Sequence, residues 1–175
     1  MTRKKKTQKR RNKILLIIAL HLAGLAVFAF YKYNSSSLPE AVIILPNSQK
    51  ISVEVASDAK SRQKGLMFKK KLKQDEGMLF VFENNLEKYF WMKNTFIDLD
   101  IIFLDGDFII NKIFENVKKS GPNDLDSKIE RVSAEGKYIL ELVAGSAGKH
   151  HLRAGLKLEI EKQDSRNKDY GIGIK

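Results

Sequence analysis

The chain contains no cysteine. This absence excludes a disulfide framework, a thiolate zinc site, a thiol nucleophile and the lipid-bearing cysteine of a lipoprotein. The sequence also lacks a Gly-x-Ser-x-Gly element, the strand-to-helix turn that carries the nucleophilic serine of many hydrolases. The stability of the protein must therefore come from packing, and any chemistry must use other groups.

Acidic residues are missing from the first 37 positions, which hold nine of the 32 Lys and Arg residues. The remainder carries 23 basic residues against 21 acidic ones, a net charge of +2, although the whole chain has +11. A nearly neutral domain lacks the basic surface that binds nucleic acid, so no nucleic-acid partner is expected.

The first 33 residues combine a basic run with an uncharged apolar segment. Eight Lys or Arg residues lie between Arg3 and Lys13, and the next formal charge is Lys32. The 18 residues from Ile14 to Tyr31 would reach about 27 Å as a helix, close to the thickness of a bilayer's hydrocarbon core. Because Lys and Arg stay on the cytoplasmic side, we expect residues 1–13 inside, a signal anchor at 14–33 and the rest outside.

A cleaved signal peptide is the alternative interpretation of this segment. Val27-Phe28-Ala29 has the small residues of a cleavage site. Cleavage would leave the protein secreted or periplasmic, whereas a retained anchor makes it a single-pass protein of the cell membrane. Tyr31, Lys32 and Tyr33 suit the membrane interface and favour retention.

We predict a linker at 34–40, one domain at 41–161 and a polar tail at 162–175. Short apolar runs bounded by turn residues indicate strands rather than long helices. The expected strands are 41–45, 51–56, 78–82, 88–92, 101–104, 108–114, 131–134, 138–142 and 156–160. Asp105-Gly106-Asp107 predicts a hairpin, and Glu135-Gly136 predicts a second strand pair.

Two short helices are expected beside these strands. Ser57 or Asp58 can cap a helix that runs to about Lys64 and ends at Gly65, and a helical turn is predicted around 147–152. The predicted fold is therefore mainly β: a compact, mostly antiparallel, barrel-like single domain with two short helices. His150 and His151 are adjacent at the end of the second predicted helix, where we expect their side chains to be solvated.

Several short motifs follow one another along the proposed domain: Gly65-Leu66-Met67, Glu76-Gly77-Met78-Leu79-Phe80, Phe90-Trp91-Met92-Lys93-Asn94-Thr95, Leu99-Asp100-Ile101-Ile102-Phe103, Asp105, Glu115-Asn116-Val117, Tyr138-Ile139-Leu140-Glu141 and Ala144-Gly145. In this order they resemble one protein family, domain of unknown function 192. The resemblance covers about residues 50–160 and implies a small β-rich domain, often exported or membrane-tethered, with no established activity. This sequence departs from the family pattern at Asp98, where proline is common, and at Gly155-Leu156, where Gly-Asp is common.

The tryptophan motif is the main candidate for a ligand site. Strand alternation places Tyr89, Trp91 and Lys93 on one face and Phe90, Met92 and Asn94 on the other. An indole beside an ammonium suits an anionic, aromatic or sugar-like ligand, although core packing of Trp91 is the simpler explanation. The predicted ligand-binding residues are Trp91, Lys93, Asn94, Thr95, Glu76 and Asp100.

Two alternatives belong to other classes. A metal-independent hydrolase would need a carboxylate pair drawn from acids such as Glu76, Asp98 and Asp100. A Cu(I)-binding protein could use the thioethers of Met67, Met78 and Met92, which otherwise fill gaps in a β core.

The sequence favours a membrane-tethered extracytoplasmic binding or accessory module over an enzyme. Its expected partners are the membrane, through the N-terminal helix, and a small-molecule or envelope ligand at the Trp91 surface. No cofactor is predicted.

Overall fold

The computed structural model describes residues 12–13, 15–26 and 38–162. The chain divides into two units, Met1–Ser37 and Leu38–Lys175. In the first unit, residues 15–26 are helical and exposed. Among the described residues, no helix has both the length and the apolar character that crossing a membrane requires. Positions 14 and 27–33 of the predicted anchor, most of the predicted linker and nearly all of the predicted tail lie outside the described residues.

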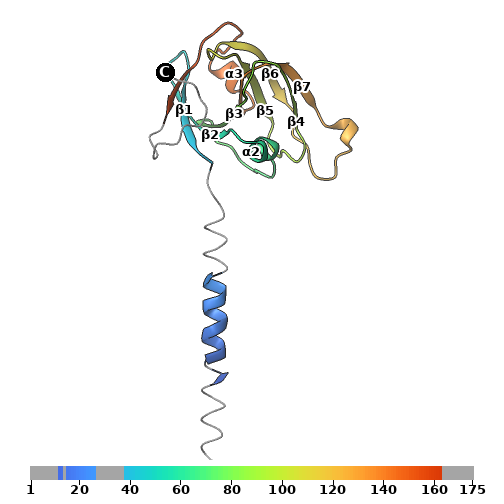
Figure 1. The fold of residues 1–175 in the computed structure, drawn as a ribbon. Helices are drawn as coiled ribbons and strands as arrows, with labels where there is room; N and C mark the ends of the chain where they lie inside the picture. The colour runs from blue at the N-terminus through green and yellow to red at the C-terminus, as the bar shows by residue number, and fades with distance from the viewer. Residues whose placement is uncertain (1–11, 14, 27–37, 163–175) are drawn as a thin grey trace, which may run out of the picture. The chain divides into compact units, whose positions relative to one another are not determined.

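The second unit is a mainly β domain built on a curled, half-barrel sheet (Figure 1). Seven strands of the described region form it in the order β6-β5-β8-β3-β2-β1-β9, and two further strands, β4 and β7, form a separate small sheet. The bounds are β1 Glu40–Ile44, β2 Lys50–Ala56, β3 Glu76–Val81, β4 Glu87–Trp91, β5 Leu99–Leu104, β6 Ile110–Val117, β7 Arg131–Glu135, β8 Tyr138–Val143 and β9 Glu159–Lys162.

The large sheet is buried on both faces, so the domain has two core layers. One layer holds the side chains of residues such as Ile102, Leu140 and Leu142, together with Ala147 of helix α3 (Ser146–Lys149). The other holds Phe103 and Ile139 and is covered by Met92, Phe90 and other residues near the small sheet. Strand alternation therefore decides which layer each residue of β5 and β8 enters.

Helix α2 (Ala59–Lys64) begins and ends where the sequence predicted. The Asp58 side chain accepts a hydrogen bond from the Ser61 backbone N–H at 2.9 Å. The Ser61 hydroxyl oxygen accepts one from the Asp58 backbone N–H, and the two bonds together form a capping box. Gly65 ends the helix with a φ of 47°, a value that L side chains rarely adopt.

The mainly β, mostly antiparallel fold with two short helices is confirmed, and so is the hairpin at residues 105–107, which joins β5 to β6. A short 3-10 helix at Asp126–Lys128 lies in addition to the two predicted helices. One pair, β2 with β3, is parallel. The last strand runs over Glu159–Lys162 rather than 156–160, and β1 starts at Glu40, inside the predicted linker.

The predicted pairing of the strands on either side of Glu135-Gly136 is wrong. β8 lies between β3 and β5, so both of its edges are already occupied. β7 pairs instead with β4, in the small sheet. The burial of the two strands explains this, since β8 is buried along nearly its whole length while β7 is only half-buried, which suits a covering layer.

Gly77 on β3 marks a close approach of two strands. A Cβ atom at this position would lie 2.7 Å from the Glu141 carbonyl oxygen and 2.8 Å from Leu142 Cδ2. We expect Gly77→Ala to lower the free energy of unfolding by about 2 kcal/mol, because backbone must shift to admit the methyl group. Chemical denaturation measures this. Gly106→Ala, whose nearest neighbour would be the flexible Lys137 side chain at 3.7 Å, is the matched control and should change stability little.

Candidate functional site

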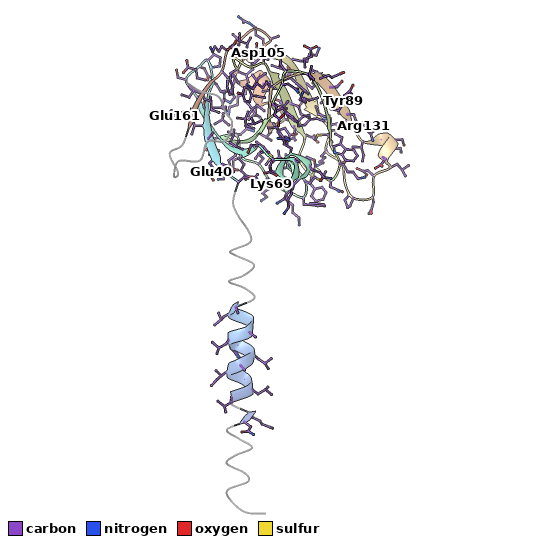
Figure 2. The ribbon with its side chains drawn as sticks, viewed as in Figure 1. Glu40, Lys69, Tyr89, Asp105, Arg131 and Glu161 are labelled. Atoms are coloured by element: carbon purple, nitrogen blue, oxygen red, sulfur yellow. The ribbon has the colours of Figure 1, made fainter. Side chains whose placement is uncertain are left out.

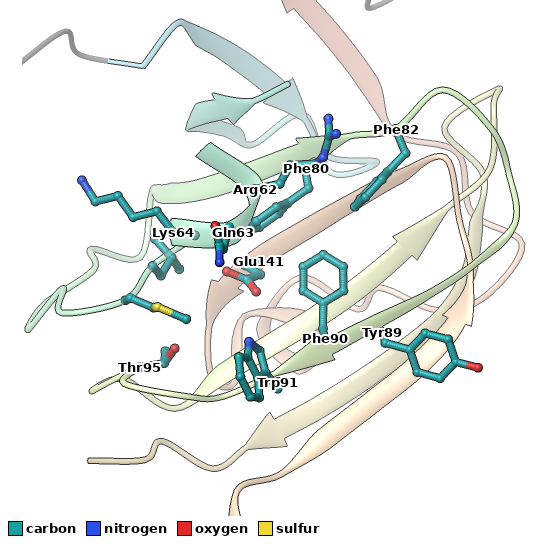
Figure 3. Close-up of a pocket in the computed structure, with 13 residues that line it drawn as sticks. Arg62, Gln63, Lys64, Phe80, Phe82, Tyr89, Phe90, Trp91, Thr95 and Glu141 are labelled. Atoms are coloured by element: carbon teal, nitrogen blue, oxygen red, sulfur yellow. The ribbon is translucent and has the colours of Figure 1, made fainter. Parts of the chain in front are cut away.

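A pocket of about 260 Å³ opens between helix α2 and strand β4. Residues 62–67 form one wall, Tyr89, Phe90 and Trp91 form the other, and side chains of β3 and β8 form the floor (Figure 3). The pocket lies in the core layer that the small sheet covers.

Glu141 is the acidic residue of the pocket floor. It lies on β8 opposite Ile101 of β5, the residue is only 6% exposed, and Figure 3 shows its carboxyl group in the pocket beside Gln63. Burial raises the pKa of this carboxyl group from 4.5 to about 8, and desolvation is the only cause. At neutral pH Glu141 is therefore mostly protonated, and it can donate a hydrogen bond as well as accept one.

Aromatic side chains form the wall opposite α2. Phe90 packs edge-to-face on Phe80 with ring centroids 4.9 Å apart, and on Phe103 at 5.9 Å. Trp91 is 45% exposed and Tyr89 is 77% exposed. The predicted alternation along β4 is therefore confirmed, and the simpler explanation that Trp91 is a core residue is wrong.

Cationic groups surround this wall. The Lys93 Nζ atom lies 4.9 Å and the Arg131 guanidinium carbon 5.9 Å from the centroid of a Trp91 ring. Arg62 and Lys64 line the pocket, and Arg62 also donates to the Val81 carbonyl oxygen at 2.9 Å. Figure 2 shows Tyr89 and Arg131 on the same side of the domain, consistent with neighbouring strands. These positive groups give the pocket mouth a preference for negative or neutral ligands.

The structure brings four of the six predicted ligand-binding residues to this region. Thr95 is buried and lines the pocket with Trp91. Lys93 stacks on Trp91 and forms an ion pair with Asp126 at 3.3 Å. Asn94 follows directly in the turn after β4, with a positive φ of 53°, and its carbonyl oxygen accepts the Phe68 N–H at 2.8 Å.

Glu76 lies at a different place. It lines a second pocket with Glu40, Glu54 and Lys69, and forms an ion pair with Lys73 at 2.6 Å. Hydrogen bonds from the Lys73 ammonium and backbone N–H lower the pKa of the Glu76 carboxyl group. Glu76 and Trp91 therefore do not share a pocket.

Asp100 is fully buried on the other face of the large sheet from Glu141. Its two carboxylate oxygens accept the backbone N–H groups of Asn116, at 2.9 Å, and of Ala147, at 2.8 Å. The first contact holds the irregular register between β5 and β6, where Asn116 has a positive φ of 55°. The second fixes the start of α3, so both oxygens already have structural partners.

We expect Asp100→Asn to destabilise the fold by about 2 kcal/mol, because an amide can accept only one of the two N–H bonds and turns a donor toward the other. Thermal unfolding measures the loss. Ligand binding at the Trp91 pocket should be unchanged in the folded fraction. A weakened affinity with unchanged stability would contradict the structural role.

One family profile matches residues 42–160, which is nearly the whole domain. The chain belongs to the DUF192 family. The family is described as an uncharacterised ACR, and its membership confirms the resemblance inferred from the motifs. No curated protein matches the chain.

Two solved structures are similar to this DUF192 domain. A protein from Sinorhizobium meliloti 1021, provisionally described as a transcription regulator, is 31% identical with a TM-score of 0.60, covering 71% of this chain and 95% of its own. A protein of unknown function from Novosphingobium aromaticivorans DSM 12444 is 29% identical with a TM-score of 0.59, covering 71% and 88%.

Asp98, one of the departures from the family pattern, has a backbone role here. Its Oδ1 atom accepts the Lys119 N–H at 2.8 Å, and this hydrogen bond lowers the pKa of the carboxyl group. Asp98, Asp100 and Glu76 thus each have a separate hydrogen-bond or ion-pair partner.

The methionines of this DUF192 protein are divided between the pocket and the core. Met67 lines the pocket, while Met78 and Met92 are buried in the adjoining core layer. No group of three His, Cys, Asp or Glu side chains within the described ranges could hold a metal ion.

His150 is buried, only 4% exposed, rather than solvated as expected. Its Nδ1 atom lies 3.3 Å from the Asn47 side-chain nitrogen, and burial lowers the pKa of the imidazole. Its Nε2 atom has no partner within the described residues. His151 is exposed and has a positive φ of 52°.

Sequence reasoning missed Glu141 as a site residue, and it missed the wall from α2. A signal for Glu141 was available, because it is the single charge in the strand Tyr-Ile-Leu-Glu-Leu-Val. A charge inside a buried strand requires an explanation, since burial without a partner is costly. No comparable signal existed for residues 62–67, whose approach to β4 depends on tertiary packing.

Proposed function

We propose that this DUF192 protein is a membrane-tethered extracytoplasmic binding module whose ligand, an envelope component, occupies the pocket between α2 and β4. One observation carries the proposal: an exposed tryptophan borders a pocket whose floor holds a buried carboxyl group that has no cationic partner among residues 38–162. A buried polar group of this kind is costly in the free protein, and a ligand that hydrogen-bonds to it recovers part of that cost.

The chemistry of the pocket supports binding more than catalysis. Glu141 is the acid among the residues that line it, and the other lining side chains are aromatic, aliphatic, thioether, amide, hydroxyl or cationic. A glycosidase-type mechanism needs a second carboxyl group about 5 to 10 Å from the first. Aromatic surface combined with a few convergent polar groups is typical of ligand-binding clefts.

The tether is supported by the sequence of residues 1–33, with its basic run and uncharged apolar segment. The transcription-regulator description of the Sinorhizobium protein does not favour the same role here, because residues 38–175 carry a net charge of only +2. Fusion of alkaline phosphatase after residue 175 tests the location in a bacterial host. Activity of the reporter supports export, and an inactive reporter on a stable fusion contradicts it.

Ligand binding is testable through Trp91, which is the single tryptophan of the chain. Cell-wall sugars, lipid headgroups and exported peptides are titrated into the full-length protein, and tryptophan fluorescence is followed together with amide chemical shifts. We expect one class of compound to shift both Trp91 and residues 62–67. Shifts confined to places far from Trp91, or no shift with any class, would overturn the proposal.

A further inference from the structure

Strand β4 has one edge beside the pocket that pairs with no other described strand. Its hydrogen bonds to β7 show which residues face the partner: Met92 N–H donates to the Glu130 carbonyl at 3.1 Å, and Gly136 N–H donates to the Leu86 carbonyl at 3.3 Å. Backbone groups alternate in direction along a strand, so Leu86, Lys88, Phe90 and Met92 turn theirs toward β7. The N–H and C=O groups of Tyr89 and Trp91 therefore face away from β7.

Within the part of the chain that the structure describes, these outward backbone groups have no partner. β4 and β7 form a sheet of two strands, and no other described residue hydrogen-bonds to the main chain of Tyr89 or Trp91. The opposite edge, on β7, is partly covered, since the Asn111 side chain donates to the Glu135 carbonyl at 3.2 Å. A two-stranded sheet with one open edge is a template for another strand.

The open edge and the pocket share residues. Tyr89, Phe90 and Trp91 line the pocket consecutively, as expected when a strand runs along its rim. A strand added to this edge would alternate its side chains. Those on the Phe90 side would enter the pocket toward Phe80 and Glu141, and those on the other side would lie beside Tyr89 and Trp91.

Charge indicates what such a strand would carry. Lys93 and Arg131 lie over Trp91, and Lys64 and Arg62 stand on the facing wall. Two acids stand against these four cations: Glu87, which accepts hydrogen bonds from the Tyr89 and Ser133 hydroxyls and stays negatively charged, and Asp126, which pairs with Lys93. The residues flanking the edge thus present an excess of positive charge to a partner.

We propose, building on the binding role above, that the ligand is an extended polypeptide segment with acidic side chains, which adds to the free edge of β4 and places an apolar side chain in the pocket. Main-chain hydrogen bonds to Tyr89 and Trp91 supply affinity, the pocket selects the inward side chain, and the cations select the outward ones. A glycan is less favoured, because regularly spaced N–H and C=O groups match a peptide backbone.

The test uses the full-length protein in detergent and a blocked hexapeptide of alternating Glu and Val. Trp91 fluorescence and calorimetry follow the titration at pH 7. We expect binding that weakens at least tenfold when Lys replaces Glu in the peptide, and that weakens as salt is added. Binding of the Glu and Lys peptides with equal affinity would overturn the charge selection and with it the proposed partner.

Backbone methylation tests strand addition directly. Two peptides carry N-methyl groups either on all Glu or on all Val residues, so that side chains and charges are kept. One of the two should lose at least tenfold in affinity and the other should lose little. Loss in the Glu set indicates an antiparallel strand, and loss in the Val set indicates a parallel one. Equal affinity of both methylated peptides with the parent contradicts strand addition.

A substitution in the protein tests strand addition independently of the peptides. Tyr89→Pro removes an N–H from the free edge, where proline is tolerated, and should weaken peptide binding at least tenfold relative to Tyr89→Ala. Ser133→Pro is the matched control, because Ser133 lies directly opposite Tyr89 and its N–H faces the other edge. It should bind the peptide as the wild type does. If Tyr89→Pro fails to fold, the methylated peptides decide.

The outcomes separate this partner from the broader binding role. Binding of cell-wall sugars or lipid headgroups at Trp91, with no peptide binding, overturns the peptide and leaves the binding module standing. Absence of binding by every probe overturns both.

Discussion

Replacing Glu141 with glutamine should make the protein more stable than the wild type at pH 9, by up to about 5 kcal/mol, and should change its stability little at pH 4. The cause is the pKa of this carboxyl group, which burial raises from 4.5 to about 8. At about 1.4 kcal/mol for each pH unit between those values, the difference reaches this upper limit.

The sign follows from proton binding. Between pH 4.5 and 8 the folded protein holds a proton on Glu141 that the unfolded chain has released, so the wild type loses stability as the pH rises through this window. Above pH 8 the loss is complete, because the buried carboxylate is charged in both states. Glutamine has similar shape and hydrogen-bonding ability but never acquires the charge, so the variant avoids the loss.

Urea unfolding of both proteins at several values of pH measures the effect. Glu76→Gln is a control whose stability should depend on pH in the opposite direction, because hydrogen bonds from Lys73 lower the pKa of Glu76. Its contribution to stability is present above the unfolded pKa and is lost as the pH falls. A Glu141→Gln variant whose stability follows the wild type from pH 5 to 9 would show that the carboxyl group is not desolvated as described.

Phe90→Ala should lower the free energy of unfolding by about 3 kcal/mol, the cost of removing a packed phenylalanine from a core. Phe90 lies between the small sheet and the large one, with edge-to-face contacts to Phe80, Phe82 and Phe103. Since it also forms a wall of the pocket, its loss should weaken any ligand at Trp91 as well.

Urea unfolding followed by circular dichroism reports the whole domain, and Trp91 fluorescence reports the small sheet. In the variant we expect the fluorescence transition to occur at a lower urea concentration than the circular dichroism transition, because β4 and β7 lose the side chain that packs them on the large sheet. Tyr89→Ala is the comparison, since Tyr89 is 77% exposed on the same strand and should change stability by about 0.5 kcal/mol or less. A loss below 1 kcal/mol for Phe90→Ala would contradict the packing described.

Local patterns predicted much of the fold. Asp58 and Gly65 mark the two ends of α2, because helix capping and a positive φ depend on the local sequence alone. The hairpin turn at Asp105-Gly106-Asp107 is also a local feature and was predicted in the same way. The alternation at Phe90 and Trp91 likewise predicted which of the two side chains faces the core. The strand pairing after Glu135 was not predictable in this way, because two adjacent strands with a turn between them can each find a better partner elsewhere.

The candidate site also combines features that the local sequence predicted with features that only tertiary contacts set. Trp91, Lys93 and Thr95 follow one another in a single motif, so the sequence alone placed them near each other. Glu76 and Asp100 belong to other motifs, and their positions near turns could not show that one lies in a second pocket and the other beneath α3. Spacing along a chain carries no information on which layer a distant strand enters.

By itself, the sequence determined the absence of thiol chemistry, the near-neutral charge after residue 37, the β-rich class and the family. These depend on composition and on neighbours in the chain. Only the tertiary structure decided that Glu141 and Trp91 line one pocket, that Asp100 holds β6 and α3, and that one edge of β4 has no partner strand among the described residues. Burial, and with it the pKa of Glu141, is a property of what packs around a residue, and that is set by contacts between segments distant in sequence.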